Sequence, residues 1–263
     1  MSPSKAALAS LILALACSAQ ANMRAAFNYI EAPSSPLAPP KASVSIPQLI
    51  VQKETLDIDC DDSRCWVEAV YHLTSSADAM LEFAFIMPSN TPVEAKVAGH
   101  YSASKVTLEK EEINQKELKY SCSSWSHCAD SLPLYRASFI GKVFKGKNTV
   151  EVAYFQPLTL LERDYGYFTD SRYVEVFIYE LAPLKEWQLA DDFTLDVTLS
   201  ALRKRPERNK GWSLFSSRSV NCFLSGQKVE KDGDYLNLAA SLDKNFPNTL
   251  ICNMGDSDLI KDN

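Results

Sequence analysis

The sequence has few glycines and few histidines, and each shortage removes a class of functional site. Only 8 of the 263 residues are Gly and only 3 are His. A loop that cradles phosphate depends on glycines, and a metal centre built from imidazoles needs several histidines. The sequence also lacks a Cys-x-x-Cys pair, a Gly-x-Ser-x-Gly elbow and a His-Glu-x-x-His motif. It therefore carries no local signature of an enzyme, and we expect no cofactor.

Long apolar runs are absent apart from Ala6–Ala16, which follow Lys5 and precede Ala19-Gln20-Ala21. This run is shorter than the roughly 20 residues that cross a bilayer. A positive charge, a short apolar run and a small-x-small motif are the parts of a secretion signal. We expect residues 1–21 to be a signal peptide and no segment to span a membrane. The alternative processing, lipidation of Cys17, matches the lipobox pattern poorly.

Positive charge is in short supply, with 27 Lys and Arg against 33 Asp and Glu and a net charge of −6. An acidic protein of this kind lacks the basic surface that nucleic acids require. The one basic cluster, at 203–210, is typical of a solvated loop. We therefore expect no nucleic-acid partner. No Asn-x-Ser/Thr sequon occurs, which favours a bacterial source.

Seven cysteines are present, and removal of the signal would leave six. Along the sequence these six fall into three successive pairs: Cys60 and Cys65, Cys122 and Cys128, and Cys222 and Cys252, of which the last are 30 residues apart. An even number of cysteines in an exported chain predicts disulfides. None of the pairs has the spacing of a zinc knuckle. We expect a secreted or periplasmic protein with structural disulfides.

Strict alternation of apolar and polar residues is the dominant pattern in the rest of the chain. In Trp66–Leu73 and in Phe193–Ser200 every second residue is apolar, which predicts half-buried strands. About ten such short segments, separated by turn residues, predict an all-β fold with one or two antiparallel β-sandwich domains stapled by disulfides. The charged stretch Thr107–Tyr120 fits either a solvated helix or an exposed hairpin arm.

The domain organisation follows from proline content and from a break in the alternation at 165–171. Residues 31–47 contain five prolines, which favour an extended arm. We expect a Pro-rich N-terminal arm over 22–43, an N-terminal β-sandwich over 44–162, a C-terminal β-sandwich over 172–254 and a polar tail over 255–263. One continuous larger sandwich is the alternative.

Acidic residues at alternate positions suggest a calcium site. Asp57, Asp59, Asp61 and Glu68 occupy positions 1, 3, 5 and 12 of the twelve-residue calcium loop. Position 6, which needs a glycine for its sharp turn, is Asp62. The flanking segments are predicted strands rather than helices. We therefore keep these four residues only as weak calcium candidates and expect no metal.

Aromatic residues on loops are the stronger indication of function, because large rings give contact area at a low entropic cost. The candidate binding residues are Trp125, His127, Tyr165, Tyr167 and Phe168. The first two lie between Cys122 and Cys128. The alternative interpretation of Tyr165, Tyr167 and Phe168 is that they cap the end of a sandwich.

These patterns lead to a main hypothesis and two alternatives. The main one is an exported, non-enzymatic β-sandwich protein that binds a partner, protein rather than carbohydrate, in the cell envelope or outside the cell. The first alternative is an exported hydrolase with catalytic residues assembled from distant strands, which would draw on His72, His100 or His127. The second is a calcium-dependent adhesin-like module.

Overall fold

The computed structural model describes residues 28–29, 37, 47–87, 90–101, 105–111, 134–164, 172–204 and 217–260. In these residues the chain is almost entirely β, as predicted, with one short 3-10 helix, η1 (Ala182–Glu186). None of the helices among them is long and apolar enough to cross a membrane. The predicted signal peptide, residues 1–21, lies outside the described residues.

The largest sheet has eight strands in the order β14-β15-β12-β2-β3-β9-β5-β6. In chain order these strands are β2 (Leu49–Cys60), β3 (Arg64–Ser75), β5 (Val93–Val97), β6 (His100–Tyr101), β9 (Gly146–Pro157), β12 (Gln188–Leu202), β14 (Lys228–Asp232) and β15 (Tyr235–Leu242).

Two smaller sheets complete the fold. The five-stranded sheet, in the order β1-β10-β11-β16-β13, consists of β1 (Asn28–Tyr29), β10 (Thr159–Asp164), β11 (Arg172–Glu180), β13 (Arg218–Asn221) and β16 (Thr249–Asp256). The three-stranded sheet, in the order β4-β8-β7, consists of β4 (Ala79–Met87), β7 (Thr107–Glu111) and β8 (Leu134–Val143).

One ladder departs from the antiparallel pairing that we expected. Strands β2 and β12 run parallel, from Gln188 opposite Ile50 to Ala201 opposite Cys60. Parallel neighbours need a long crossover, and here the crossover consists of all the chain between β2 and β12. These two strands come from opposite sides of the predicted boundary at 165–171, so the two halves of the chain share the eight-stranded sheet.

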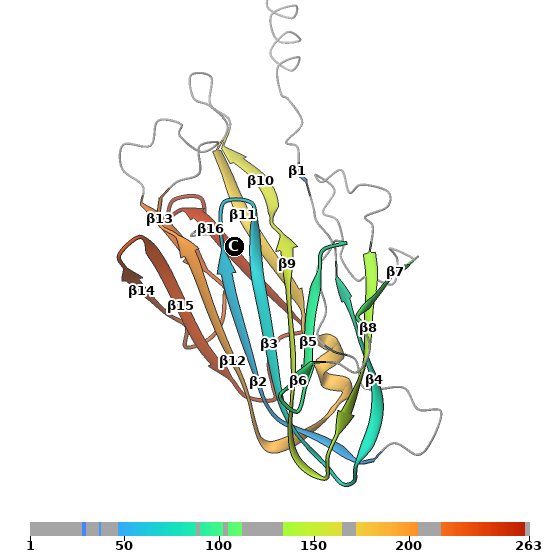
Figure 1. Cartoon of the computed structure of the whole chain (residues 1–263). Coiled ribbons are helices and arrows are strands. Elements are labelled where there is room, and N and C mark those ends of the chain that lie inside the picture. Colours follow the sequence, from blue (N-terminus) through green and yellow to red (C-terminus); the bar gives the residue numbers. More distant parts are fainter. Residues whose placement is uncertain are drawn as a thin grey trace, which may run out of the picture.

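The core lies between the eight-stranded sheet and the two smaller sheets. One continuous cluster of buried apolar residues includes side chains from all three. Strand β13 of the five-stranded sheet contacts β15, and β8 of the three-stranded sheet contacts β5, so the smaller sheets lie toward opposite ends of the large one (Figure 1). The approach of β8 to β5 requires Gly141, because a Cβ there would lie 2.2 Å from Cγ2 of Val97.

The predicted inward faces are buried. In β3, Val67, Ala69, Tyr71 and Leu73 point into the core, and β12 buries every second residue from Phe193 to Leu199. The opposite face of the eight-stranded sheet carries mostly polar side chains, with the partly exposed Trp66, Val70 and Phe155 as exceptions. Antiparallel sheets commonly leave one face to solvent in this way, which is why alternation identified these strands.

Two of the three predicted disulfides lie in the described residues and are confirmed. Cys60–Cys65 closes the β2–β3 turn, and Cys222–Cys252 joins the end of β13 to β16. The predicted pair of Cys122 and Cys128 lies outside the described residues.

Described parts of the predicted arm and tail pack against the body. Asn28 and Tyr29 pair with β10, and Leu37 is 1% exposed. The backbone N–H of Leu37 donates to the Tyr71 hydroxyl at 3.4 Å, and its carbonyl accepts a hydrogen bond from Nε1 of Trp187 at 2.8 Å. At the other end, the segment that we expected to be a polar tail from 255 includes the end of β16 and the buried Ile260.

Candidate functional site

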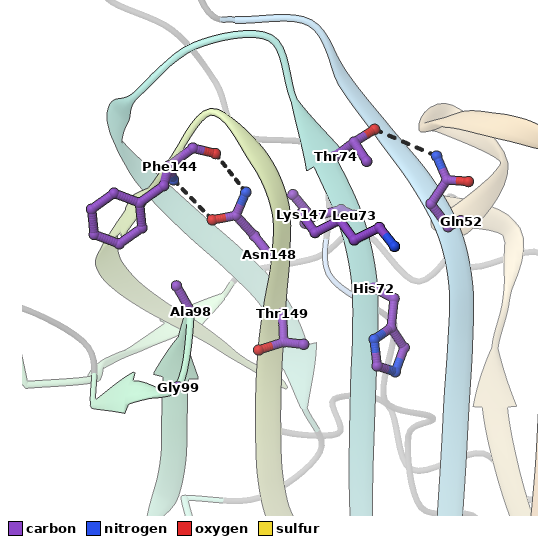
Figure 2. A pocket seen from close by; sticks show the side chains of 10 residues that line it. All are labelled: Gln52, His72, Leu73, Thr74, Ala98, Gly99, Phe144, Lys147, Asn148 and Thr149. Carbon is purple, nitrogen blue, oxygen red and sulfur yellow. Dashed lines mark hydrogen bonds between the residues drawn. The ribbon is translucent and has the colours of Figure 1, made fainter.

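An open depression lies on the outer face of the eight-stranded sheet, beside the β8–β9 connection (Figure 2). Its volume is about 760 Å³. Its lining residues are Gln52, His72, Leu73, Thr74, Ala98, Gly99, Phe144, Lys147, Asn148 and Thr149. They come from β2, β3, β9 and the two connections at the end of the sheet, so segments that are distant in the sequence build the site together.

The floor of the depression is a block of outward-facing polar side chains on two neighbouring strands. His72 of β3 lies opposite Thr149 of β9, and Thr74 lies opposite Lys147. Alternation places these residues on the solvent side, because the odd-numbered residues of β3, Leu73 among them, point into the core. Gln52 joins the block from β2, where an irregularity in the register falls between Val51 and Lys53. Its Nε2 donates to Oγ1 of Thr74 at 3.4 Å.

One wall is the corner between β8 and β9, which the buried Asn148 holds in shape. The Phe144 N–H donates to Oδ1 of Asn148 at 2.8 Å. Nδ2 of Asn148 donates in turn to the carbonyls of Phe144, at 2.7 Å, and Gly146, at 2.9 Å. Gly146 has φ +98°, a backbone conformation that favours glycine. These bonds fix the backbone that carries the Phe144 ring, which stands 40% exposed beside the depression.

The tight turn between β5 and β6 adds to the same side of the depression, next to Phe144 (Figure 2). Ala98 has φ +52° and Gly99 has φ +78°. A left-handed conformation is unfavourable for alanine and persists only where its surroundings enforce it. Here the Ala98 N–H donates to the carbonyl of Thr149 at 2.7 Å, which ties the turn to the strand that forms the floor.

The depression carries positive charge although the protein is acidic. None of its described lining residues is Asp or Glu, whereas Lys147 lines it directly. Lys142 adds a second ammonium, whose Nζ lies 4.7 Å from the centre of the Phe144 ring. Two nearby carboxylates on the same sheet are neutralised, because Lys53 pairs with Asp196 and Lys96 pairs with Glu151. A third carboxylate, that of Asp78, lies beside the corner and accepts a hydrogen bond from the Lys145 N–H at 2.8 Å.

The predicted binding residues Trp125, His127, Tyr165, Tyr167 and Phe168 all lie outside the described residues. Sequence reasoning named His72 only as a candidate of the hydrolase alternative, and the structure brings it into the depression. It gave no role to Phe144 or Lys147. Gly-Lys-Asn at 146–148 is a turn pattern that includes Lys147 and lies close to Phe144 in the sequence, but it shows neither that Asn148 is buried nor that Phe144 is exposed.

The calcium candidates do not gather into a site. Asp57 and Glu68 are opposite each other on β2 and β3, and Asp57 accepts a hydrogen bond from the Thr198 hydroxyl. Asp61 closes the β2–β3 turn by accepting hydrogen bonds from the N–H groups of Ser63 and Arg64. Partial burial raises the pKa of Asp61, but these hydrogen bonds together outweigh it and lower the pKa. Across the described ranges, no three His, Cys, Asp or Glu side chains lie close enough together to hold a metal ion.

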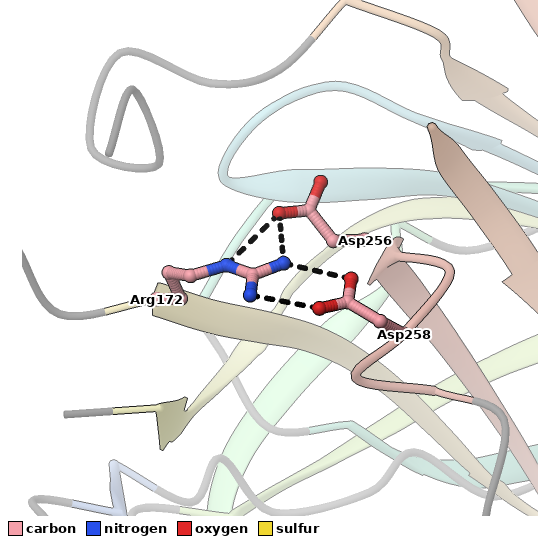
Figure 3. A network of polar contacts seen from close by, with 3 residues as sticks. All are labelled: Arg172, Asp256 and Asp258. Carbon is pink, nitrogen blue, oxygen red and sulfur yellow. Dashed lines mark hydrogen bonds and ion pairs between the residues drawn. The ribbon is translucent and has the colours of Figure 1, made fainter. Parts of the chain in front are cut away.

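A second polar cluster lies at the end of the five-stranded sheet and ties down the end of the described chain (Figure 3). Nη2 of Arg172 donates to Asp256 at 2.6 Å and to Asp258 at 2.8 Å, and Nε donates to Asp256 at 3.1 Å. Hydrogen bonding to Asp258, and then to Asp256, raises the pKa of Arg172 above its ordinary value despite partial burial. The charged groups drawn in Figure 3 face one another, so this cluster is a clamp rather than an open site.

A third polar group lies inside the core. Glu54 of β2 is 0% exposed, and both its carboxyl oxygens lack a hydrogen bond of good geometry in the described structure. Burial raises its pKa to about 8, and the hydroxyl of Tyr71 lowers it to a smaller extent. Burial also raises the pKa of Tyr71 and of Tyr179. Glu54 is therefore a protonated carboxyl at neutral pH, shielded from solvent and from any ligand in the depression.

Comparisons with known proteins add a fold but no family. A scan against protein-family models finds no match, and neither does a search of the curated proteins. A search of solved structures matches 107 chains. One is a crystal structure from Legionella pneumophila, provisionally described as a nutrient-binding protein, with a TM-score of 0.54 and 9% sequence identity over 86% of this chain and 72% of that chain. At this identity the likeness shows the fold alone, and one fold serves many functions.

Proposed function

We propose that this chain is an exported, non-enzymatic binding protein that holds a segment of a partner protein in the depression beside Phe144. The observation that carries the proposal is the depression itself, with a fixed aromatic wall and a floor of hydrogen-bonding side chains. Rigid walls reduce the ordering cost of binding. Phe144 offers apolar contact area, and the polar floor offers orientation.

A protein segment suits the shape better than a buried small molecule does. The depression is open along the outer face of a sheet, whereas small-molecule sites enclose most of their ligand. The description of the Legionella structure as a nutrient-binding protein is compatible with a binding role but concerns that protein. The hydrolase alternative has less support, because no described lining residue is an Asp or Glu that could orient His72 as a base for the Thr149 hydroxyl opposite it.

Export is supported by the disulfides, because such bonds persist in oxidising compartments. The test is the intact mass of the chain produced with its own N-terminus and recovered outside the cytoplasm of a bacterial host. We expect the mass of a chain cleaved after Ala21 with all six remaining cysteines oxidised. Retention of residues 1–21, or a lipid on Cys17, would contradict this processing.

The binding role is tested by selecting random displayed peptides on the immobilised protein. We expect the enriched peptides to bind the Phe144→Ala variant at least about tenfold more weakly, the loss of roughly 1.4 kcal/mol that one buried aromatic contact supplies. The matched control is Phe223→Ala, because Phe223 is also exposed, at 42% against 40%, and lies outside the depression. Peptides that bind both variants equally, or a selection that enriches none, would overturn the proposal.

A further inference from the structure

Each polar side chain on the floor of the depression can donate a hydrogen bond, and the Lys147 ammonium can only donate. Lys147 carries three N–H donors and no acceptor, and His72 donates from its ring in either protonation state. Thr74 accepts a hydrogen bond from Gln52, so its own hydroxyl hydrogen can be donated outward. Because the described lining holds a cation and no carboxylate of its own, it fits a ligand rich in acceptors better than a cationic one.

Lys147 is a charged residue of the lining. None of the described carboxylates forms an ion pair with it, whereas Lys53 and Lys96, on the same sheet, are each paired. Lys142, near the Phe144 ring, adds to the positive charge at the corner. A ligand carboxylate at Lys147 would therefore gain a charge-assisted hydrogen bond without displacing an existing partner.

From these contacts we infer that the depression recognises an acidic segment of a partner protein, with a carboxylate at Lys147 and a neighbouring apolar side chain against Phe144. The inference rests on the proposed function and specifies its ligand. The protein's net charge of −6 opposes an acidic partner only weakly, because exposed charges more than about 10 Å apart are largely screened at 0.1 M salt. The local donors and the Lys147 ammonium therefore decide the preference.

The test uses three fluorescent extended peptides of equal length that share one Leu and are otherwise rich in Glu, in Lys or in Ser. We expect the Glu-rich peptide to bind best and to lose affinity as salt is added. Lys147→Glu should weaken it by about tenfold or more. The matched control Lys231→Glu, on the exposed edge strand β14, should bind like the unaltered protein. Thermal melts of both variants verify that each is folded.

Other outcomes separate this inference from the proposed function. If the Ser-rich or Lys-rich peptide binds as well as the Glu-rich one and Phe144→Ala weakens it, the acidic preference is refuted while the docking site stands. If a single-stranded oligonucleotide binds at Lys147 more tightly than the Glu-rich peptide, the ligand class is wrong. If no peptide binds, or if neither Lys147→Glu nor Phe144→Ala changes the affinity, both the inference and the proposed function are refuted.

Discussion

Replacing Glu54 with Gln should remove a pH-dependent loss of stability from the protein. The pKa of Glu54 is about 8 in the folded chain, against an ordinary value of 4.5. Below the ordinary value both the folded and the unfolded chain hold this proton. Between the two values only the folded chain holds it, so the free energy of unfolding falls as the pH rises. Above about pH 8 neither state holds it, and the dependence ends.

The magnitude follows from the separation of the two pKa values. Each pH unit between them lowers the free energy of unfolding by about 1.4 kcal/mol, so the whole interval from 4.5 to about 8 amounts to roughly 5 kcal/mol. The amide of the Glu54→Gln variant does not titrate in this range. Its N–H groups would lack partners in the core, which costs about 1 to 3 kcal/mol at every pH. The diagnostic quantity is therefore the difference in slope, not the stability at one pH.

The assay is urea unfolding, followed by intrinsic fluorescence with the disulfides oxidised, at several values between about pH 5 and about pH 8. The unaltered protein should lose stability relative to Glu54→Gln by about 1.4 kcal/mol per unit. The matched control is Glu82→Gln, because Glu82 is on the exposed side of β4 and its replacement should leave the slope unchanged. Parallel curves for the unaltered protein and Glu54→Gln would show that Glu54 is not a buried protonated carboxyl.

Three further changes test the contact between β8 and β5, the Cys222–Cys252 disulfide and the Arg172 clamp. Gly141→Ala should lower the free energy of unfolding by about 1 to 3 kcal/mol in urea. A second change, Val97→Ala, should recover part of this loss, because it removes the Cγ2 that lies 2.2 Å from the new Cβ while leaving the Val97 Cβ at 2.7 Å. Replacing Cys222 and Cys252 together by Ser should cost about 4 kcal/mol in the same assay, since the bond closes a loop with a separation of 30 residues, and a loss below about 1 kcal/mol would contradict this. Arg172→Ala should cost about 3 kcal/mol and speed hydrogen exchange in β16, whereas unchanged exchange would refute the clamp.

The inner faces of the strands could be predicted because burial on one side of a sheet requires an apolar residue at every second position. Two segments expected as strands, Trp66–Leu73 and Phe193–Ser200, lie within β3 and β12. The Cys222–Cys252 pair could be predicted as well. Asn221 and Asn253 are opposite each other in the β13–β16 ladder, so each cysteine is next to a paired residue and within reach of the other.

Alternation does not identify strands that lack a buried face, and it does not show which distant strands pair. All five residues of β14 are exposed, so no alternation marks it. The stretch from Thr107 was expected to be a solvated helix or a hairpin arm, and it begins with strand β7, which ends at Glu111. Its residues are charged on every side, so their pattern could not distinguish a helix from a strand. The parallel β2–β12 ladder depends on the path of more than half the described chain, which local patterns do not encode.

The depression was beyond sequence reasoning for a different physical reason. His72 and Lys147 follow the same outward alternation as every other polar residue on the sheet, so their spacing looks ordinary. What distinguishes them is a wall fixed by hydrogen bonds to Asn148, a turn held in a left-handed conformation at Ala98, and carboxylates neutralised elsewhere on the sheet. The buried Asn148 fixes the shape of the depression, and outward side chains such as His72 and Lys147 determine which ligand it binds. Substitutions at outward positions should therefore change the partner while leaving stability nearly unchanged, which is how one fold can carry different ligands.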